Sequence, residues 1–244
     1  MGKTVIITGA SSGIGAALAR EFASRGYNVG LMARRVDRLE TLAQELRGKG
    51  VKVELGAVDV ANDTTVHAAV DALREKLGDL DVFVANAGIT TINRTGAGDI
   101  SKDKEVFAVN LIGAIASLDA AAKYFRAKKR GHLVGISSIA GIKPIPGSGS
   151  YSASKAALSM WLRAAGIELQ KHGISVTAIH PGFIKSELVP DMEKYPFIIE
   201  ADAAARQMVD AIEKKKGSVI VPWWPWKPML VLGNLLPERF SKLF

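Results

Sequence analysis

The feature that most constrains the fold of this chain is a regular alternation of short apolar segments with longer amphipathic ones. The apolar segments are rich in β-branched residues and almost continuously apolar, as strands of a sheet covered on both faces have to be. We expect strands at residues 5–8, 29–33, 51–58, 82–85, 132–137, 175–180 and 218–221. The helical spacing of apolar residues predicts helices at residues 14–24, 38–47, 64–77, 105–128, 153–170 and 203–214.

The order of these segments predicts the architecture. A strand–helix–strand unit repeated this often implies a parallel sheet with right-handed crossovers. The length, 244 residues, suits one large domain. We therefore predict an α/β fold over residues 1–222, a single Rossmann-type doubly wound parallel sheet of about seven strands with helices on both faces. Residues 223–244 are apolar and rich in tryptophan and proline, and we treat them as a C-terminal tail.

The composition excludes several kinds of site. The chain has no cysteine, so disulfides, thiolate metal sites and cysteine nucleophiles are ruled out. The four histidines lack carboxylate or histidine partners at metal-ligand spacing, so no metal is predicted; they are His67, His132, His172 and His180. The first residues do not resemble a secretion signal, and no run of about 18 apolar residues occurs. We therefore expect a cytoplasmic protein without a membrane-spanning helix.

The net charge of +8 is compatible with nucleic acid, an anionic membrane surface or a polyanionic cofactor as a partner. Two cationic clusters, at residues 123–130 and 214–216, lie where helices are expected to end, and cations there complement the helix dipole. No zinc-finger spacing or aromatic RNA-binding pattern accompanies them. We therefore do not expect nucleic-acid binding.

A glycine-rich turn follows the first expected strand. Residues 8–15 read Thr-Gly-Ala-Ser-Ser-Gly-Ile-Gly, and a helix follows directly. Glycines in such a turn let the backbone approach a pyrophosphate, and the helix N-terminus favours negative charge. No Gly-Lys-Ser/Thr sequence follows, which disfavours a P-loop nucleoside triphosphatase. We predict a dinucleotide site formed by Gly9, Ser11, Ser12, Gly13, Ile14 and Gly15.

The end of the second strand indicates which dinucleotide binds. NAD-preferring sites carry an acidic residue here, which binds the 2′-hydroxyl of the adenosine ribose. This chain has Arg34 and Arg35 and no carboxylate at that point. Because a guanidinium offers a planar set of donors suited to phosphate, we predict that Arg34, helped by Arg35 or Ser12, binds a 2′-phosphate. The cofactor is then NADP, with NADPH preferred over NADH; the alternative is that both arginines are merely solvated.

Tyr151 and Lys155 are one helical turn apart and therefore lie on the same face of a helix. Such a pair is a weak signal alone, since Tyr124 and Lys128 form a second one. Only the first pair has a hydroxyl at a matching place upstream, Ser138, which ends an expected strand. Catalytic side chains of open α/β sheets collect at strand ends. We therefore predict that Ser138, Tyr151 and Lys155 act together.

These motifs resemble, in order and spacing, those of the short-chain dehydrogenase/reductase family, from Thr4 to about Pro222. Asn86-Ala87-Gly88 is similar to the family's fourth-strand motif, although Ala85 stands where many members have asparagine. Ser186 stands where many members have threonine, and the hydroxyl is retained. The resemblance implies the catalytic residues Asn110, Ser138, Tyr151 and Lys155. It also implies further cofactor contacts. Asp59 and Val60 would contact the adenine, and the other contacts are Asn86, Ala87, Gly88, Tyr151, Lys155, Pro181, Gly182, Ile184 and Ser186.

The resemblance also implies roles. Ser138 would bind the substrate oxygen, Lys155 the nicotinamide ribose, and Asn110 a water molecule that links Lys155 to solvent. Free tyrosine has a pKa near 10. We expect the ammonium of Lys155 to lower the pKa of Tyr151, which then exchanges a proton with the substrate oxygen.

We therefore expect an NADP(H)-dependent oxidoreductase, a carbonyl reductase or alcohol dehydrogenase, that interconverts a ketone or aldehyde and an alcohol by hydride transfer. Residues 183–200 should form a substrate lid, and their apolar character favours a hydrophobic small-molecule substrate. The alternative is a catalytically silent dinucleotide-binding sensor or scaffold, because a fold alone does not fix function.

Two further expectations concern surfaces. The helices at 105–128 and 153–170 carry small or apolar residues on more than one side, which favours a homodimer or homotetramer. In the tail, Trp223, Trp224 and Trp226 allow either packing over the lid and the substrate pocket or peripheral membrane contact. We favour packing, because three exposed tryptophans would form the apolar patch that soluble proteins avoid.

Overall fold

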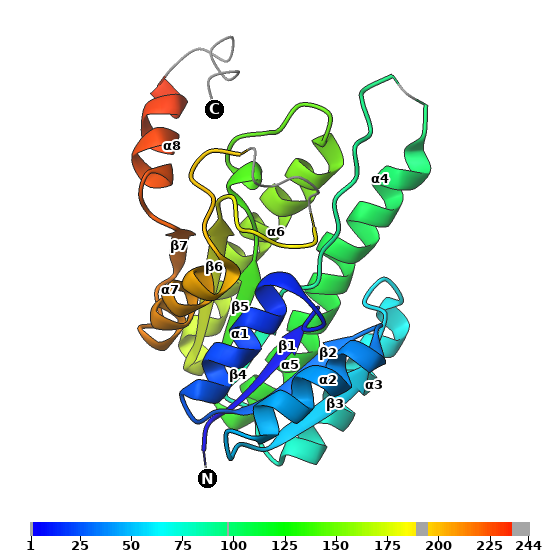
Figure 1. Cartoon of the computed structure of the whole chain (residues 1–244), viewed down its shortest axis with the longest axis vertical. Helices are drawn as coiled ribbons and strands as arrows, with labels where there is room; N and C mark the ends of the chain where they lie inside the picture. The colour runs from blue at the N-terminus through cyan, green and yellow to red at the C-terminus, as the bar shows by residue number, and fades with distance from the viewer. Residues whose placement is uncertain (1, 97, 189–194, 236–244) are drawn as a thin grey trace.

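The computed structural model describes residues 2–96, 98–188 and 195–235 (Figure 1). The strands are β1 (Thr4–Thr8), β2 (Asn28–Ala33), β3 (Val53–Ala57), β4 (Val82–Ala85), β5 (Gly131–Ile136), β6 (Ile174–Pro181) and β7 (Ser218–Val221). The α-helices are α1 (Gly13–Ser24), α2 (Val36–Arg47), α3 (Asp63–Leu77), α4 (Ile100–Phe107), α5 (Ala114–Lys128), α6 (Gly149–Leu169), α7 (Ala201–Glu213) and α8 (Trp226–Leu235). Shorter helical turns are η1 (Ala108–Gly113), η2 (Ile139–Gly141) and η3 (Gln170–His172).

The strands form one seven-stranded sheet in the order β3-β2-β1-β4-β5-β6-β7, and every pairing is parallel. This confirms the predicted doubly wound sheet. The strand order reverses between β1 and β4, because the chain first runs outward to β3 and then returns to the other side of β1. In open α/β sheets such a reversal leaves a crevice at the carboxyl ends of the strands.

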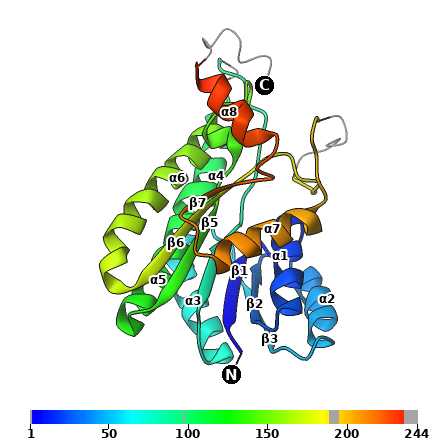
Figure 2. The ribbon, with the colours of Figure 1, turned by 90° about the vertical axis from the view of Figure 1, so that its left-hand side faces the viewer.

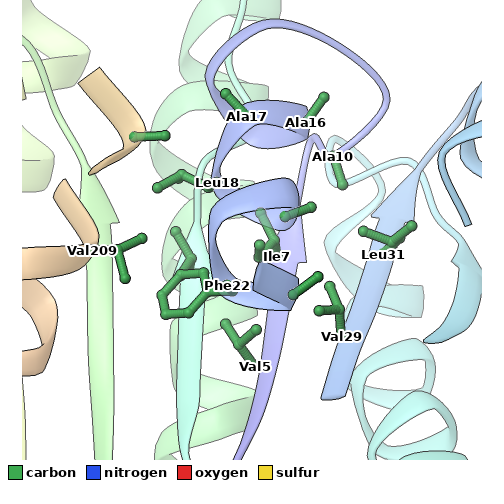
Figure 3. Packing of buried hydrophobic residues seen from close by; sticks show 14 of the residues in the cluster. Val5, Ile7, Ala10, Ala16, Ala17, Leu18, Phe22, Val29, Leu31 and Val209 are labelled. Atoms are coloured by element: carbon green, nitrogen blue, oxygen red, sulfur yellow. The ribbon is translucent and has the colours of Figure 1, made fainter. Parts of the chain in front are cut away.

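Helices cover both faces of the sheet (Figure 2). α1, α2 and α7 lie on one face, and α3, α5 and α6 lie on the other. Figure 3 shows the core of the first face, where Phe22 of α1 lies with Val5 and Ile7 of β1. Phe83 and Phe125 are fully buried on the second face. Each such side chain contributes about 1.5–3 kcal/mol through burial, so packing on both faces stabilises the sheet beneath the crevice.

The expected helix at 105–128 begins earlier and is interrupted. Six residues in π-helical form, η1, separate α4 from α5. Gly113 ends this turn and packs against the segment between β3 and α3. A Cβ on Gly113 would lie 2.3 Å from the carbonyl oxygen of Val60 in that segment. Single π-turns inside helices are frequent at functional sites, and η1 contains Asn110.

Within the described residues, one helical stretch, Ile100–Lys128, is long and apolar enough to cross a membrane. However, 56% of its most apolar window is buried inside the fold. Leu118 and Phe125 of α5 are fully buried in the same cluster as Phe83 of β4. The stretch is therefore a core helix covering the sheet.

The tail contains a helix that the sequence analysis did not predict, α8, at the same end of the molecule as the lid (Figure 1). Pro225 and Pro228 argue against a helix interior, but Pro228 falls in the first turn of α8. Proline is tolerated there because the first N–H groups of a helix have no intrahelical partner. Residues 236–244 of the tail lie outside the described residues.

Candidate active site

A cleft with a volume of about 900 Å³ opens at the carboxyl ends of the strands. One end is formed by the turn after β1 and the end of β2, and the other by the ends of β5 and β6, the start of α6, and α8. All of the site residues proposed from the sequence line this cleft except Gly15 and Asn110, which lie behind its wall. The topology therefore brings together motifs that are widely separated along the chain.

The turn after β1 needs its glycines. Gly9 and Gly13 have φ angles of +66° and +53°, in the left-handed region that favours glycine. A Cβ on Gly15 would lie 2.3 Å from the carbonyl oxygen of Gly9. The backbone is thus without side chains at these positions, and Gly13 and Ile14 at the start of α1 line the cleft. This is the cradle that a pyrophosphate requires, and the residues fit a dinucleotide.

Asn86 holds this turn in shape. Its Nδ2 donates to the carbonyl oxygens of Thr8 and Gly9, at 3.0 and 3.2 Å. In return, the Thr8 hydroxyl accepts from the backbone N–H groups of Asn86 and Ala87, at 3.0 and 3.1 Å. Asn86 therefore fixes the shape of the turn, besides lining the cleft.

The two arginines after β2 have different surroundings. Arg35 Nη2 donates to the hydroxyls of Ser11 and Ser12, at 3.0 and 2.8 Å. Arg34 Nη1 lies 3.7 Å from Asp59 Oδ2, in a solvent-exposed pair. Two guanidinium groups and two hydroxyls therefore gather at one end of the cleft, a donor set that suits a phosphate. Arg34 was predicted to take the leading role, whereas Arg35 is the arginine that contacts the glycine turn.

Glu187 lies beside Arg35, although its sequence neighbourhood does not predict a role for it. Its carboxylate accepts from Arg38 Nη1 at 2.7 Å and from Arg35 Nη1 at 3.4 Å. Arg38, followed by Arg35, lowers the pKa of Glu187. Glu187 follows Ser186 in the lid, so these contacts join the lid to the end of β2. No local pattern announces them, because the partners are 149 and 152 positions apart.

Ser138, Tyr151 and Lys155 meet at the other end of the cleft. Ser138 follows β5, and its Oγ accepts from the N–H of Ala140 at 3.0 Å. Tyr151 and Lys155 lie in the first turns of α6, with Lys155 Nζ 5.9 Å from the centre of the Tyr151 ring. The ammonium also donates to the carbonyl oxygen of Ile136 at 2.8 Å, which fixes its position.

Burial shifts the pKa values of both titratable groups. It raises the pKa of Tyr151, while a hydrogen bond with Ser138 works in the opposite direction. Burial also lowers the pKa of Lys155 to about 8. Both shifts have the same cause, since a low-dielectric site disfavours the charged form of each group. The expected lowering of the Tyr151 pKa is therefore corrected: desolvation dominates, and the phenol is protonated near neutral pH.

Asn110 is fully buried in the π-turn. Its Oδ1 accepts from the N–H of Ile89 at 2.8 Å, and its Nδ2 donates to the carbonyl oxygen of Ile89 at 2.9 Å and to Ser154 Oγ at 3.3 Å. Asn110 thus ties the turn to the segment after β4 and to α6. The water molecule that Asn110 is expected to hold stays a prediction.

The lid is closed at its base by backbone contacts. The backbone N–H of Lys185 donates to the carbonyl oxygen of Ile199 at 3.0 Å, and the N–H of Ile199 donates to the carbonyl oxygen of Phe183 at 3.2 Å. Ile184 is buried at this base, and Pro181, Gly182 and Ser186 line the cleft beside it. Residues 189–194 of the expected lid lie outside the described residues.

The tail divides into two kinds of side chain. Trp226 and Leu230 are buried and, with Met229, line the cleft, which agrees with packing over the pocket. Trp223 and Trp224 are 63% and 64% exposed. Sequence patterning could not separate these tryptophans, because their burial depends on the position of α8.

The histidines do not form a metal site in the part of the chain that the structure describes, where no group of three or more potential ligands is found. His132 Nε2 lies 2.7 Å from Thr177 Oγ1. Burial lowers the pKa of His132 to about 4. Burial also lowers the pKa of His180, which lies beside the backbone of Ser138. Both side chains are therefore neutral near pH 7.

Comparison with known proteins places this fold in a family. The family model described as short chain dehydrogenase matches residues 3–196. An uncharacterized oxidoreductase of Mycobacterium tuberculosis is 36% identical over 245 aligned residues, which cover 99% of this chain and 97% of that protein. 11-beta-hydroxysteroid dehydrogenase 1A of Arabidopsis thaliana is 35% identical, over 97% of this chain and 73% of that protein. A short-chain dehydrogenase from Sphingobium yanoikuyae, solved in complex with NADPH, aligns with a TM-score of 0.86 and 28% identity, over 96% of this chain and 93% of that one.

The parallel sheet and its glycine turn define a Rossmann-type fold that suits a dinucleotide. The match over most of its length shows that the chain belongs to the short-chain dehydrogenase family, whose members use a nicotinamide dinucleotide.

Proposed function

We propose that this protein is an NADP(H)-dependent oxidoreductase that interconverts a ketone or aldehyde and the corresponding alcohol. The observation that carries the proposal is the placement of Ser138, Tyr151 and Lys155 in the same cleft as a phosphate-binding glycine turn. A bound nicotinamide dinucleotide supplies or accepts the hydride. The side chains of the protein orient both molecules and move the proton.

Tyr151 gives its phenolic proton to the carbonyl oxygen during reduction and takes a proton from the alcohol during oxidation. Its raised pKa keeps the proton in place until the oxygen gains negative charge. The hydroxyl of Ser138 donates to the same oxygen and stabilises that charge. Lys155, held by Ile136, stabilises the phenolate that remains.

The cofactor preference rests on the end of the cleft near β2. Arg34 and Arg35, with the hydroxyls of Ser11 and Ser12, offer donors to a 2′-phosphate. The relative from Sphingobium yanoikuyae was solved with NADPH. We therefore expect a lower KM for NADPH than for NADH, and Arg34→Ala to reduce this preference mainly by raising the KM for NADPH. Equal use of both cofactors by the unmodified protein would contradict the preference.

The substrate is proposed to be apolar. The walls near Ser138 and Tyr151 come from Ile139, Phe183 and Trp226, which form one apolar cluster. Such walls favour a ketone or alcohol with a large hydrocarbon substituent, because burying apolar surface drives binding there. The hydroxysteroid dehydrogenase name of the Arabidopsis thaliana relative is in line with this class of substrate.

A direct test is to incubate the protein with NADPH and a panel of apolar and polar ketones, following the nicotinamide absorbance. Consumption of NADPH that depends on the ketone supports an enzyme. Binding of NADPH without turnover of any ketone or alcohol would favour the alternative, a silent dinucleotide-binding sensor or scaffold. The presence of Ser138, Tyr151, Lys155 and Asn110 together weighs against that alternative, since binding alone does not require the proton-transfer group.

We also propose that the protein acts in the cytoplasm as a homodimer or homotetramer. The proposal on assembly is supported by apolar side chains on the outer face of α6, where Met160 and Ile167 are 61% and 80% exposed. Part of the apolar surface that the sequence assigned to an interface serves the core instead, because Ala114, Ala120 and Ala121 are buried within the fold.

A further inference from the structure

Gly182 and Trp226 lie against each other at the substrate end of the cleft. Gly182 follows β6, and Trp226 begins α8. A Cβ added to Gly182 would lie 2.3 Å from Nε1, 2.6 Å from Cδ1 and 2.8 Å from Cε2 of Trp226. The φ angle of Gly182 is not in the left-handed region, so its backbone does not require glycine. The nearest obstacle to a side chain at position 182 is the indole ring itself.

Trp226 is held from several sides. Its side chain is only 3% exposed. Phe183 meets the ring edge to face with the ring centres 5.1 Å apart, and Phe197 of the lid does so at 6.1 Å. Ile139, the residue after Ser138, belongs to the same apolar cluster, as does Leu230. The ring therefore joins the segment after β5, the segment after β6, the lid and α8.

This contact depends on the shape of the ring and not on a polar group. Trp226 Nε1 is buried and has no hydrogen-bond partner among the described residues. A buried donor without a partner costs free energy. Phenylalanine at this position would thus lose no hydrogen bond while keeping an aromatic ring against Gly182 and Phe183.

We propose that Trp226 is a specificity-determining residue, which fixes through Gly182 and Phe183 the wall against which the larger apolar substituent of the ketone lies. The proposal rests on the proposed carbonyl reduction, because the ketone oxygen is placed at Ser138 and Tyr151. Ile139 follows Ser138 directly, and Trp226 and Met229 line the same cleft. The substituent therefore extends from the reacting carbon toward α8, which makes the C-terminal helix part of the substrate site.

The first experiment compares kcat/KM for a small ketone, 2-butanone, and a bulky one, 2-acetylnaphthalene. Trp226→Ala removes the wall, so the ratio of the two values should change by about tenfold or more in favour of the bulky ketone. Trp226→Phe should keep the ratio close to that of the unmodified protein. Trp224→Ala is the matched control, since this neighbouring indole is exposed and does not line the cleft.

The second experiment is a double-mutant cycle between the two positions. Gly182→Ala places a methyl group in the space of the indole and should lower kcat/KM in the presence of Trp226. In the Trp226→Ala background the three nearest obstacles are absent, so the same change should lower kcat/KM by a much smaller factor. Such non-additivity measures the direct coupling of the two residues. Thermal unfolding of each variant identifies any that fails to fold. If Trp226→Ala does, Trp226→Leu, which removes the ring but keeps an apolar side chain, should shift the ratio in the same direction.

Two outcomes would overturn the inference. One is a loss of kcat/KM in Trp226→Ala by the same factor for both ketones, which would mark a general structural role. The other is additive effects of Gly182→Ala and Trp226→Ala. If the unmodified protein reduced neither these ketones nor any other of the panel, the proposed function would fail first and separately.

Discussion

Tyr151 carries the proton in the proposed reaction, so its hydroxyl is the most informative atom to remove. Tyr151→Phe keeps the ring and its packing in α6. We expect turnover to fall by a factor of about 10² or more, the scale of lost acid–base catalysis, while NADPH binds with nearly the same Kd. Steady-state kinetics and quenching of protein fluorescence by NADPH measure the two quantities. Unchanged turnover would contradict the assignment of Tyr151.

Lys155 couples the site to stability through its pKa of about 8, against a usual 10.5. Between these values the unfolded chain binds more protons than the folded protein, so stability rises with pH across this window. Below pH 8 the folded protein bears the full cost of the buried ammonium, on the order of 3 kcal/mol. Lys155→Met removes this dependence. Urea unfolding without added NADP(H) measures the free energy of unfolding of both proteins. The value for the variant minus the value for the unmodified protein should fall by about 3 kcal/mol between pH 8 and pH 10.5. A difference that stays constant over this range would contradict the lowered pKa of Lys155.

Glu187 and Arg35 should affect cofactor binding in opposite directions. The carboxylate partly neutralises Arg35 and Arg38, to which a 2′-phosphate is also attracted. Exposed ion pairs are worth about 0–1 kcal/mol, so Glu187→Gln should tighten NADPH binding by up to about fivefold, and Arg35→Ala should weaken it. NADH, which lacks the phosphate, should respond little. Fluorescence titration measures each Kd, with Glu200→Gln as the control on the same lid; an equal effect of Glu187→Gln on NADH would refute the explanation.

At the scale of helices and strands, the sequence predicted what local periodicity determines. The strands at residues 29–33 and 82–85 match the observed β2 and β4 closely, because a strand buried on both faces is apolar throughout. The interruption of the helix at Asn110 was not predictable in this way. It depends on contacts of Asn110 and Gly113 with Ile89 and Val60, which are distant in sequence.

The same distinction applies to the site. Gly9, Gly13, Tyr151 and Lys155 belong to short motifs whose spacing follows from one turn or one helix, so the sequence could indicate them. Glu187 and Trp226 belong to no motif. Their places depend on how the lid and α8 settle on the rest of the molecule, which only tertiary structure determines.

The C-terminal tail is an element whose removal tests its packing directly. Deletion of residues 223–244 exposes Gly182, Phe183 and Ile139, which Trp226 covers. We expect a lower midpoint of thermal unfolding and an altered ketone preference in detergent-free solution, because a buried apolar cluster loses its centre. If the truncated protein instead kept its stability and ketone preference but no longer sedimented with anionic liposomes, membrane contact through the tail would be the better explanation.

At the scale of the whole molecule, the reversal of strand order sets where chemistry occurs. The glycine turn follows β1, and Ser138 follows β5, on the two sides of β4. The proposed cofactor residues near β2 and the proposed substrate residues near β6 and α8 consequently occupy opposite ends of one cleft. Arg35 and Tyr151 would hold the two ends of a dinucleotide bound across the reversal, so the topology would align the two halves of the proposed reaction.

Assembly of the whole protein should depend on the outer face of α6. Met160 and Ile167 lie on this face with most of their surface exposed, and apolar side chains so placed favour association in symmetric oligomers. We expect light scattering at micromolar concentration to give a dimer or tetramer of the 26.0 kDa chain. Replacing both residues by glutamate should shift the protein toward the monomer, because an interface cannot bury unpaired carboxylates without a large cost. Lys214→Glu, a charge change at an exposed position after α7, should leave the mass unchanged. A monomer of the unmodified protein under these conditions would mean that this face of α6 has no partner in a second copy of the chain.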